Sequence, residues 1–323
     1  MRLAVSVFLA CGLAFGQVPR VGTIDFYGLR KIPAAKLRQE LGVQAGDPLP
    51  PSKANLEERL ETIDGVVLAR LEAVCCEAKD AILFVGIEER GAPHFEVREA
   101  PESEAVLPEE LVAAYRVFLD DFQEAALGGP VDSEFGALQE RLAALVRTNL
   151  KELRNVLRTS ADAGQRAIAA HVIVVSADRP AAAQDLQYAL QDPDEEVRRN
   201  ALSSLGTLAA YALKHPDSEI RIAPTWPVEM LSSIVWSDRT GAMSLLLTLS
   251  EAREPVVLDL IRQRAAPQLV EMARWNSLTH ALPAYILLGR VAGLSENQIQ
   301  ESWSKGEREA RIAAMERAWK TGR

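Results

Sequence analysis

Four alanines that recur along the second half of the sequence constrain the fold more than any other feature. Ala169, Ala201, Ala242 and Ala284 are separated by 32, 41 and 42 residues, and apolar residues follow each of them. Repeats of this period form pairs of helices, and each pair buries its apolar face only by stacking on its neighbours. The sequence therefore predicts an all-α solenoid over residues 160–295.

The unit around the second alanine has the most specific pattern. Asp192–Gly206 combines a loop aspartate, the Val197-Arg198 pair and a small residue, Ala201, where two helices approach each other. This segment resembles a HEAT repeat, and the resemblance extends less strongly over residues 160–295. It implies a solenoid whose concave surface binds proteins or peptides. We expect the charged residues of this unit to form a solvated loop and stacking charge pairs: Glu195, Glu196, Arg198 and Arg199.

Further helical segments flank the predicted array. The apolar spacing between residues 109 and 159 predicts a helical hairpin, broken at Gly128-Gly129-Pro130, whose second helix runs to about Arg158. Residues 296–323 are charged and follow Ser295, which is a suitable N-cap. We predict one terminal helix there that caps the array.

Residues 17–90 combine strand and helix patterns in a small α+β module. Pro33 opens one predicted helix that ends at Gly42, and Ser52 is a suitable N-cap for a second that ends at Gly65. In chain order, the predicted elements are a strand over 24–27, helices over 33–41 and 53–63, and strands over 66–74 and 81–87. Residues 91–108, with three prolines, are predicted to be a linker.

Three short segments relate this β-α-α-β-β order to a known family. They are Gly28-Leu29 after the first strand, Gly46-Asp47 before the second helix, and 85–89 at the end of the third strand. With them the module resembles a POTRA domain. The resemblance implies an interaction module outside the cytoplasm, which binds partners largely by adding a strand to a sheet edge.

The last predicted strand has two apolar faces. Leu83, Val85 and Ile87 share the face that suits packing under the two helices, whereas Ile82 and Phe84 share the opposite face. A three-stranded module alone would leave this second face in water. Two explanations stay open: the face packs against the rest of the chain, or it is a partner-docking surface.

Several large side chains in the array are not required by its helical core. Trp and Arg are frequent anchors of protein interfaces, although a tryptophan on a helix is more often half-buried packing. Together with the second strand face, the candidate partner-binding residues are Ile82, Phe84, Trp236, Arg239, Arg274, Trp275 and His280.

The first 16 residues have the pattern of an export signal, with Arg2, an apolar run to Phe15 and small residues before Gln17. Lipoprotein anchoring at Cys11 is an alternative. The mature chain is expected to be periplasmic or secreted, without a transmembrane segment. Its net charge of −10, which is the −9 of the whole sequence less Arg2, disfavours nucleic acid as a partner.

The cysteines left after cleavage, Cys75 and Cys76, are adjacent. Neighbouring residues of a strand point to opposite faces, so an unstrained disulfide between them is not expected. The simplest interpretation is two small, partly buried hydrophobic residues. Redox or intermolecular pairing is the alternative, because exported proteins meet oxidising surroundings.

The sequence contains none of the familiar catalytic motifs: no G-x-G-x-x-G, P-loop, H-E-x-x-H or G-x-S-x-G. None of its four histidines has a neighbouring ligand at metal-binding spacing. We therefore expect no enzyme activity, catalytic residues, metal or cofactor. The favoured function is an exported scaffold or adaptor with a protein or peptide partner. One alternative is an accessory subunit of an envelope assembly or secretion complex that binds clients by strand addition. Another is a HEAT-fold enzyme or cofactor-binding protein.

Overall fold

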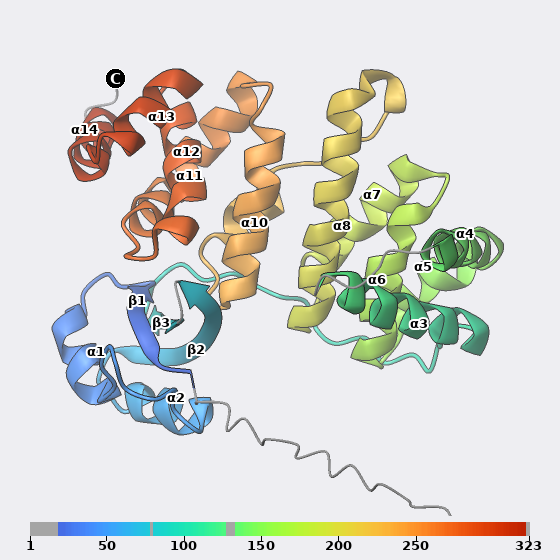
Figure 1. The fold of residues 1–323 in the computed structure, drawn as a ribbon, viewed down its shortest axis with the longest axis horizontal. Helices are drawn as coiled ribbons and strands as arrows, with labels where there is room; N and C mark the ends of the chain where they lie inside the picture. The colour runs from blue at the N-terminus through green and yellow to red at the C-terminus, as the bar shows by residue number, and fades with distance from the viewer. Residues whose placement is uncertain (1–18, 78–79, 127–132, 321–323) are drawn as a thin grey trace, which may run out of the picture.

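The computed structural model describes residues 19–77, 80–126 and 133–320, in which an N-terminal α/β module lies against one side of a helical array (Figure 1). The predicted export signal, with Cys11, lies outside the described residues. So do the turn at residues 78–79 and the predicted helix break at residues 128–130.

The module has the predicted order of elements. These are β1 (Val21–Tyr27), α1 (Ala34–Leu41), α2 (Lys53–Glu61), β2 (Val66–Glu77) and β3 (Asp80–Glu89). In the sheet, β3 lies in the centre, parallel to β1 and antiparallel to β2. β1 and β2 are therefore the two edge strands.

Local chemistry explains where the two helices of the module begin and end. α1 ends at Gly42, which adopts the left-handed conformation with φ 61° that favours glycine, and Ser52 caps α2 by accepting a hydrogen bond from the Asn55 N–H. Both helices pack on one face of the sheet, where Leu83, Val85 and Ile87 are buried as predicted. The alternation in β3 thus identified its helix-facing side.

Cys75 differs from its expected environment. Its side chain is exposed and disulfide-bonded, so it is not the partly buried hydrophobic residue that the sequence suggested. The side chains of the other two cysteines, Cys11 and Cys76, lie outside the described part of the chain.

The array consists of two rows of helices. The inner row is α6 (Ala163–Val172), α8 (Glu195–Lys214), α10 (Trp236–Leu249) and α12 (Leu278–Val291), each packed on the next. The other row is α5 (Leu150–Thr159), α7 (Arg179–Ala189), α9 (Thr225–Met230) and α11 (Pro255–Ala273), with 3-10 turns at Ile173–Val175 and Pro216–Ser218. The four recurring alanines are fully buried in the inner row. Their spacing therefore did locate the helix contacts.

Both ends of the array are more divided than the sequence suggested. The predicted hairpin over 109–159 is three helices: α3 (Glu109–Ala126), α4 (Ser133–Thr148) and α5, with a break at Asn149, whose φ and ψ of −114° and 22° are not helical. The predicted single terminal helix is α13 (Glu296–Ser304) and α14 (Arg308–Lys320). Gly306, at φ 72°, takes the left-handed conformation that ends a helix.

Buried arginine–carboxylate pairs fasten successive repeats to each other. Arg166 binds both oxygens of Asp192 at 2.8 Å, and Arg198 binds both oxygens of Asp238 at 2.9 Å. Each arginine also donates to the carbonyl six residues before it. Arg198 is only 3% exposed, so its expected place in a solvated loop is wrong. Two parallel bonds between one guanidinium and one carboxylate fix the relative geometry of the two repeats. Removing either partner would leave a buried charge without compensation.

Candidate functional site

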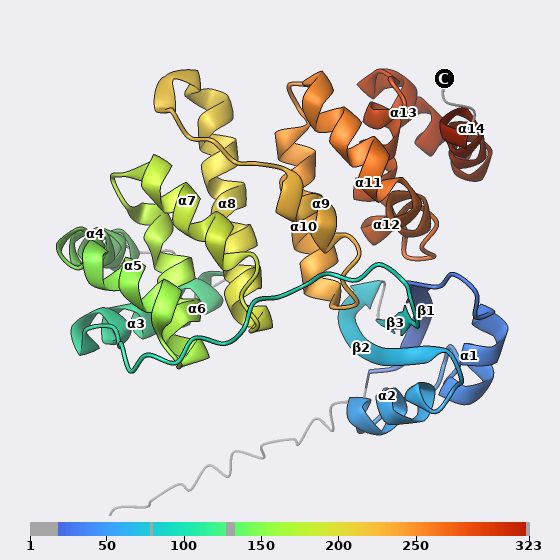
Figure 2. The same ribbon diagram turned by 180° about the vertical axis from the view of Figure 1, so that it is seen from behind.

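One edge of the array is formed by four short loops, which join the helices of each pair: α5–α6, α7–α8, α9–α10 and α11–α12. We call this the loop edge. The α/β module and residues 91–108 contact all four loops, with the sheet on the last two and the residues after β3 on the first two (Figure 2). The loop edge is where the two parts of the molecule meet.

Aromatic side chains make the apolar part of the contact between the sheet and the array. Phe84, fully buried, lies with its ring centroid 4.9 Å from Trp275, 5.5 Å from Trp236 and 5.3 Å from His280. Ile82 is buried in the same cluster. In the structure, this strand face therefore packs against the rest of the chain, which is the first of the two explanations.

Polar groups add direction to this contact. The Asp25 carboxylate, 3% exposed, accepts hydrogen bonds from the Asn276 N–H at 2.8 Å, the Asn276 side-chain amide at 2.7 Å and the Ser277 N–H at 3.1 Å. The Tyr27 hydroxyl donates to the Ile234 carbonyl at 2.7 Å, and burial raises the pKa of Tyr27, so it remains a donor. We call this set of contacts, with Phe84 and Ile82, the sheet dock.

Close approach at the sheet dock requires a glycine in β3. A Cβ atom on Gly86 would lie 2.5 Å from the Ile234 carbonyl oxygen and 2.7 Å from the Tyr27 ring. Side chains do not tolerate such distances without movement of the backbone. The sheet therefore contacts the α9–α10 loop through a position where no side chain fits.

The predicted linker over 91–108 is extended and bound to the array along its length, and we call it the strap (Figure 2). The Arg98 N–H donates to the Gln191 carbonyl at 2.8 Å, and its guanidinium lies 3.2 Å from the centroid of the Tyr188 ring. Further along, Ser103 exchanges backbone hydrogen bonds with Thr159 and Ala161 at 2.9 and 2.7 Å. Backbone hydrogen bonds, the Arg98 side chain and the side chain of Leu107, which is 4% exposed in the core of the array, together make this contact.

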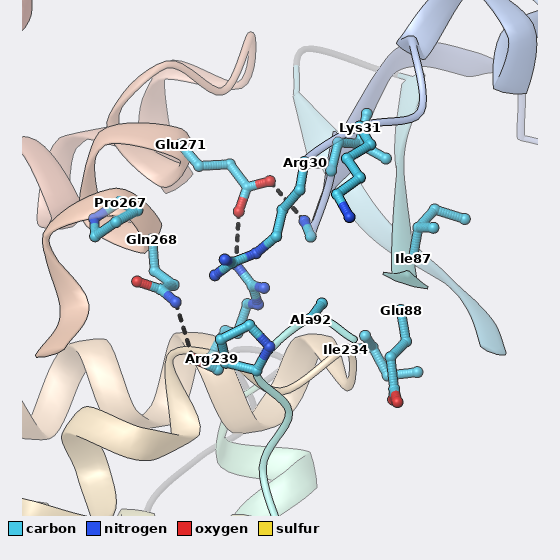
Figure 3. A pocket seen from close by; sticks show the side chains of 14 residues that line it. Arg30, Lys31, Ile87, Glu88, Ala92, Ile234, Arg239, Pro267, Gln268 and Glu271 are labelled. Atoms are coloured by element: carbon cyan, nitrogen blue, oxygen red, sulfur yellow. Dashed lines mark hydrogen bonds and ion pairs between the residues drawn. The ribbon is translucent and has the colours of Figure 1, made fainter. Parts of the chain in front are cut away.

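A pocket of about 410 Å³ opens between the module and the array beside the sheet dock (Figure 3). We call it the junction pocket. Arg239 lies in its wall, with Nη1 donating to Glu271 at 3.0 Å, Nε donating to the Ser233 carbonyl, and the guanidinium over the Tyr27 ring. The second oxygen of Glu271 accepts a bond from the Gly28 N–H of the module. Arg239 and Glu271 thus tie the array to the β1–α1 connection.

Six of the seven candidate residues from the sequence meet at this junction. The seventh, Arg274, lies elsewhere: it is exposed and pairs with Glu309 at 2.7 Å and Glu316 at 3.3 Å, which attaches α14 to the end of α11. The six at the junction all contact other parts of the same chain: Ile82, Phe84, Trp236, Arg239, Trp275 and His280. These contacts cover the six residues in the docked state. Partner binding by them therefore stays a prediction, for a state in which the sheet has separated from the array.

Sequence reasoning missed three residues of the junction. Asp25 and Tyr27 share one face of a short apolar strand, and an acidic residue at such a position was the available signal. Glu271 lies within an ordinary amphipathic helix and carries no local signal of its contact with Gly28.

Comparison with known proteins identifies one part of the array. The HEAT-repeat family profile matches residues 186–212, which include the end of α7 and most of α8. The helical array is therefore HEAT-like. No curated protein matches the chain. Within the described ranges, none of the helices has the length and apolar character needed to cross a membrane.

Proposed function

We propose that the mature chain is an exported, non-catalytic scaffold that holds a protein partner on its HEAT-like array. HEAT repeats often mediate protein interactions, and solenoids present extended surfaces suited to them. In this proposal the sheet dock and the strap make the α/β module and the array one unit. Partners then bind surfaces that the loop edge does not use.

A groove on the opposite edge of the array carries this proposal. It has a volume of about 470 Å³ and lies between the ends of α8 and α10 and the start of α11. Ala212, Leu213, Ile222, Leu249 and Val257 line it, with Arg221 and Glu254 among its polar residues. Leu213 is 41% exposed. A groove lined by both aliphatic and charged residues suits a partner that inserts aliphatic or aromatic side chains and pairs with the charges.

The POTRA resemblance of the module belongs to the same proposal. What supports it is the β-α-α-β-β order and a sheet with β3 between β1 and β2. A module of this kind would place the protein in the cell envelope or outside the cell, in agreement with the export pattern of residues 1–16.

The test is affinity capture with residues 17–323 from a cell-envelope extract, followed by mass spectrometry. Leu213→Glu places a charge in the groove, and Val117→Glu is its control, because Val117 is an aliphatic residue of α3 that is 51% exposed away from the groove. We expect wild type and Val117→Glu to retain the same protein, and Leu213→Glu to retain about tenfold less or none. Equal retention by both variants, or no retained protein, would contradict the proposal.

Strand addition to β2 is the second candidate function, because β2 is a long strand at the edge of the sheet. β2 is a 12-residue edge strand, and two of its N–H groups bond to side chains of α2: Ala69 to Glu61 at 3.0 Å and Leu71 to Glu57 at 2.7 Å. An incoming strand would offer carbonyl oxygens in place of these carboxylates.

Partner binding in the array groove and strand addition to β2 predict different results for a second variant. Glu57→Ala with Glu61→Ala uncovers the two N–H groups of β2, so an accessory subunit that binds extended clients would retain more client. Leu213→Glu would leave that retention unchanged. If the array groove holds the partner instead, the double variant has no effect and Leu213→Glu has a large one.

A further inference from the structure

The junction pocket contains a buried arginine that is only partly used. Arg239 is 2% exposed and donates through Nε and Nη1, but its Nη2 has no hydrogen-bond partner among the described residues. This nitrogen is not fully enclosed by protein atoms, so water or another acceptor can reach it. Since Arg239 lines the pocket, an acceptor placed in the pocket would satisfy this nitrogen.

Two more cations line the pocket from the side of the module. Arg30 and Lys31 follow β1, both are exposed, and neither has a carboxylate within ion-pair distance in the described part of the chain. Figure 3 shows the Arg30 side chain extending from the module toward Glu271 and Arg239. The pocket therefore brings cations from both parts of the molecule to one space.

Two carboxylates near the pocket, Glu271 and Glu89, are already engaged. Glu271 accepts bonds from Arg239 and from the Gly28 N–H, while Glu89 accepts bonds from the backbone N–H groups of Arg30, Lys31 and Ile32. Glu88 is the remaining acid in the wall, and in Figure 3 it lies across the pocket from Gln268. The cations Arg30, Lys31 and Arg239 thus outnumber the acids Glu88 and Glu271 in the wall of the pocket.

From these features we infer that the junction pocket binds a small organic anion through its carboxylate or phosphate group. Arg30 and Lys31 would hold the anionic group from the module, and Arg239 would donate to it from the array, as charge-assisted hydrogen bonds. A space of about 410 Å³ is in the range of small-molecule sites. Such a ligand bridges the two parts and therefore stabilises the docked form by mass action.

Calorimetric titration of residues 17–323 with citrate, and separately with inorganic phosphate, tests this site at constant ionic strength. The site variant is Arg30→Gln with Lys31→Gln. Lys36→Gln is the control, because Lys36 is an exposed cation of α1 that does not line the pocket. All three proteins should have the same melting temperature without ligand, since the substituted side chains are exposed.

We expect saturable one-site binding of at least one probe to wild type and Lys36→Gln, and binding weaker by tenfold or more in the site variant. A carboxylate site responds to citrate and a phosphate site to inorganic phosphate. The same ligand should raise the melting temperature of wild type and Lys36→Gln only. If neither probe binds saturably, or if all three proteins bind with equal affinity, the inference is overturned.

Discussion

The sheet dock and the strap cover the same loop edge by different means. The sheet dock uses buried side chains: Phe84 among tryptophans, and Asp25 and Tyr27 bonded to loop backbone. The strap buries Leu107 in the array near its end, but between Val97 and Ser103 it uses its backbone, with Ser103 paired to the α5–α6 loop and Arg98 to the α7–α8 loop. The edge therefore has one contact that depends on side-chain identity and one, over residues 97–103, in which backbone bonds leave exposed side chains open to substitution.

This difference has an energetic consequence. Truncating a buried aromatic side chain lowers the free energy of unfolding by several kcal/mol, whereas a backbone hydrogen bond at a surface contributes about 1 kcal/mol net. Substitutions in the sheet dock should therefore lower stability much more than substitutions in the strap between Val97 and Ser103. The predictions below test this ranking.

Phe84→Ala should have the largest effect. It removes a fully buried ring from the cluster with Trp236, Trp275 and His280, and we expect a loss of about 3–5 kcal/mol in the free energy of unfolding. Urea unfolding followed by tryptophan fluorescence measures it, since two tryptophans lie in the cluster. The control is Val97→Ala in the strap, which is exposed and should change stability by less than about 0.5 kcal/mol. Equal effects would remove the distinction between the two contacts.

Gly86→Ala tests the close approach of the sheet to the α9–α10 loop. The added methyl group meets the Ile234 carbonyl, so we expect a loss of about 1–3 kcal/mol, again by urea unfolding. Gly206→Ala in α8 is the matched control: nothing lies within 4 Å of its Cβ position, so it should stabilise the helix by about 0.5–1 kcal/mol. If the two substitutions shift stability in the same direction, the contact is not as close as described.

Asp25→Asn keeps the shape of the side chain and removes its charge and one acceptor. Because the carboxylate accepts three N–H donors in a buried site, we expect a loss of about 1–3 kcal/mol. Asp64→Asn, at an almost fully exposed surface ion pair with Arg90, should change the free energy by at most about 0.5 kcal/mol. Similar values for both would mean that Asp25 does not hold the α11–α12 loop.

Glu89 should make the module sensitive to acid. Burial raises the pKa of its carboxyl, but the backbone N–H groups of Arg30, Ile32 and Lys31 lower it more, so the pKa lies below the ordinary 4.5. Its stabilising contribution is therefore present above pH 4.5 and is lost as the pH falls through the lowered value. The stability difference between wild type and Glu89→Gln should shrink from pH 7 to pH 3. A difference that stays constant over this range would contradict the assignment.

Arg98→Ala should have the smallest effect on global stability. The guanidinium stacks on Tyr188 and donates to its carbonyl, but its Nε and Nη1 are buried without partners, which offsets the gain. We expect a change of at most about 1 kcal/mol by urea unfolding. Hydrogen exchange at the Ser103 N–H should nevertheless become faster, because the strap loses an anchor. A loss as large as that of Phe84→Ala would show that the strap is the stronger contact.

Periodicity and capping chemistry predicted the parts of the fold that depend on local sequence. The spacing of Ala169 and its three counterparts located the inner row of helices, and the alternation in β3 identified the side that packs on α1 and α2. The helix break at Asn149 escaped prediction because apolar spacing continues from Val146 to Leu150 and Leu153, whereas Gly306 was an available stop signal that was not used.

For the junction, the sequence left two alternatives open: packing against the rest of the chain, or a partner-docking surface. The sequence indicated that Ile82 and Phe84 needed a cover, but which surface provides it depends on how the module and the array meet in three dimensions. The sequence predicted the strap only as a linker, and its docking gave no signal, since residues 98–103 are extended, bound through backbone groups and without an apolar period. Arg198 was misplaced for a similar reason: its partner Asp238 is 40 residues away.

Hydrogen–deuterium exchange at the loop edge of residues 17–323 tests the central claim most directly. If the module and the strap are docked along this edge, the N–H groups of Ser277 and Asn276, bonded to Asp25, and those of Arg98 and Ser103 exchange slowly. If these four exchange at the rate of an unstructured peptide while amides within β3 and α8 stay protected, the module and the array fold separately. That result would contradict the docked arrangement.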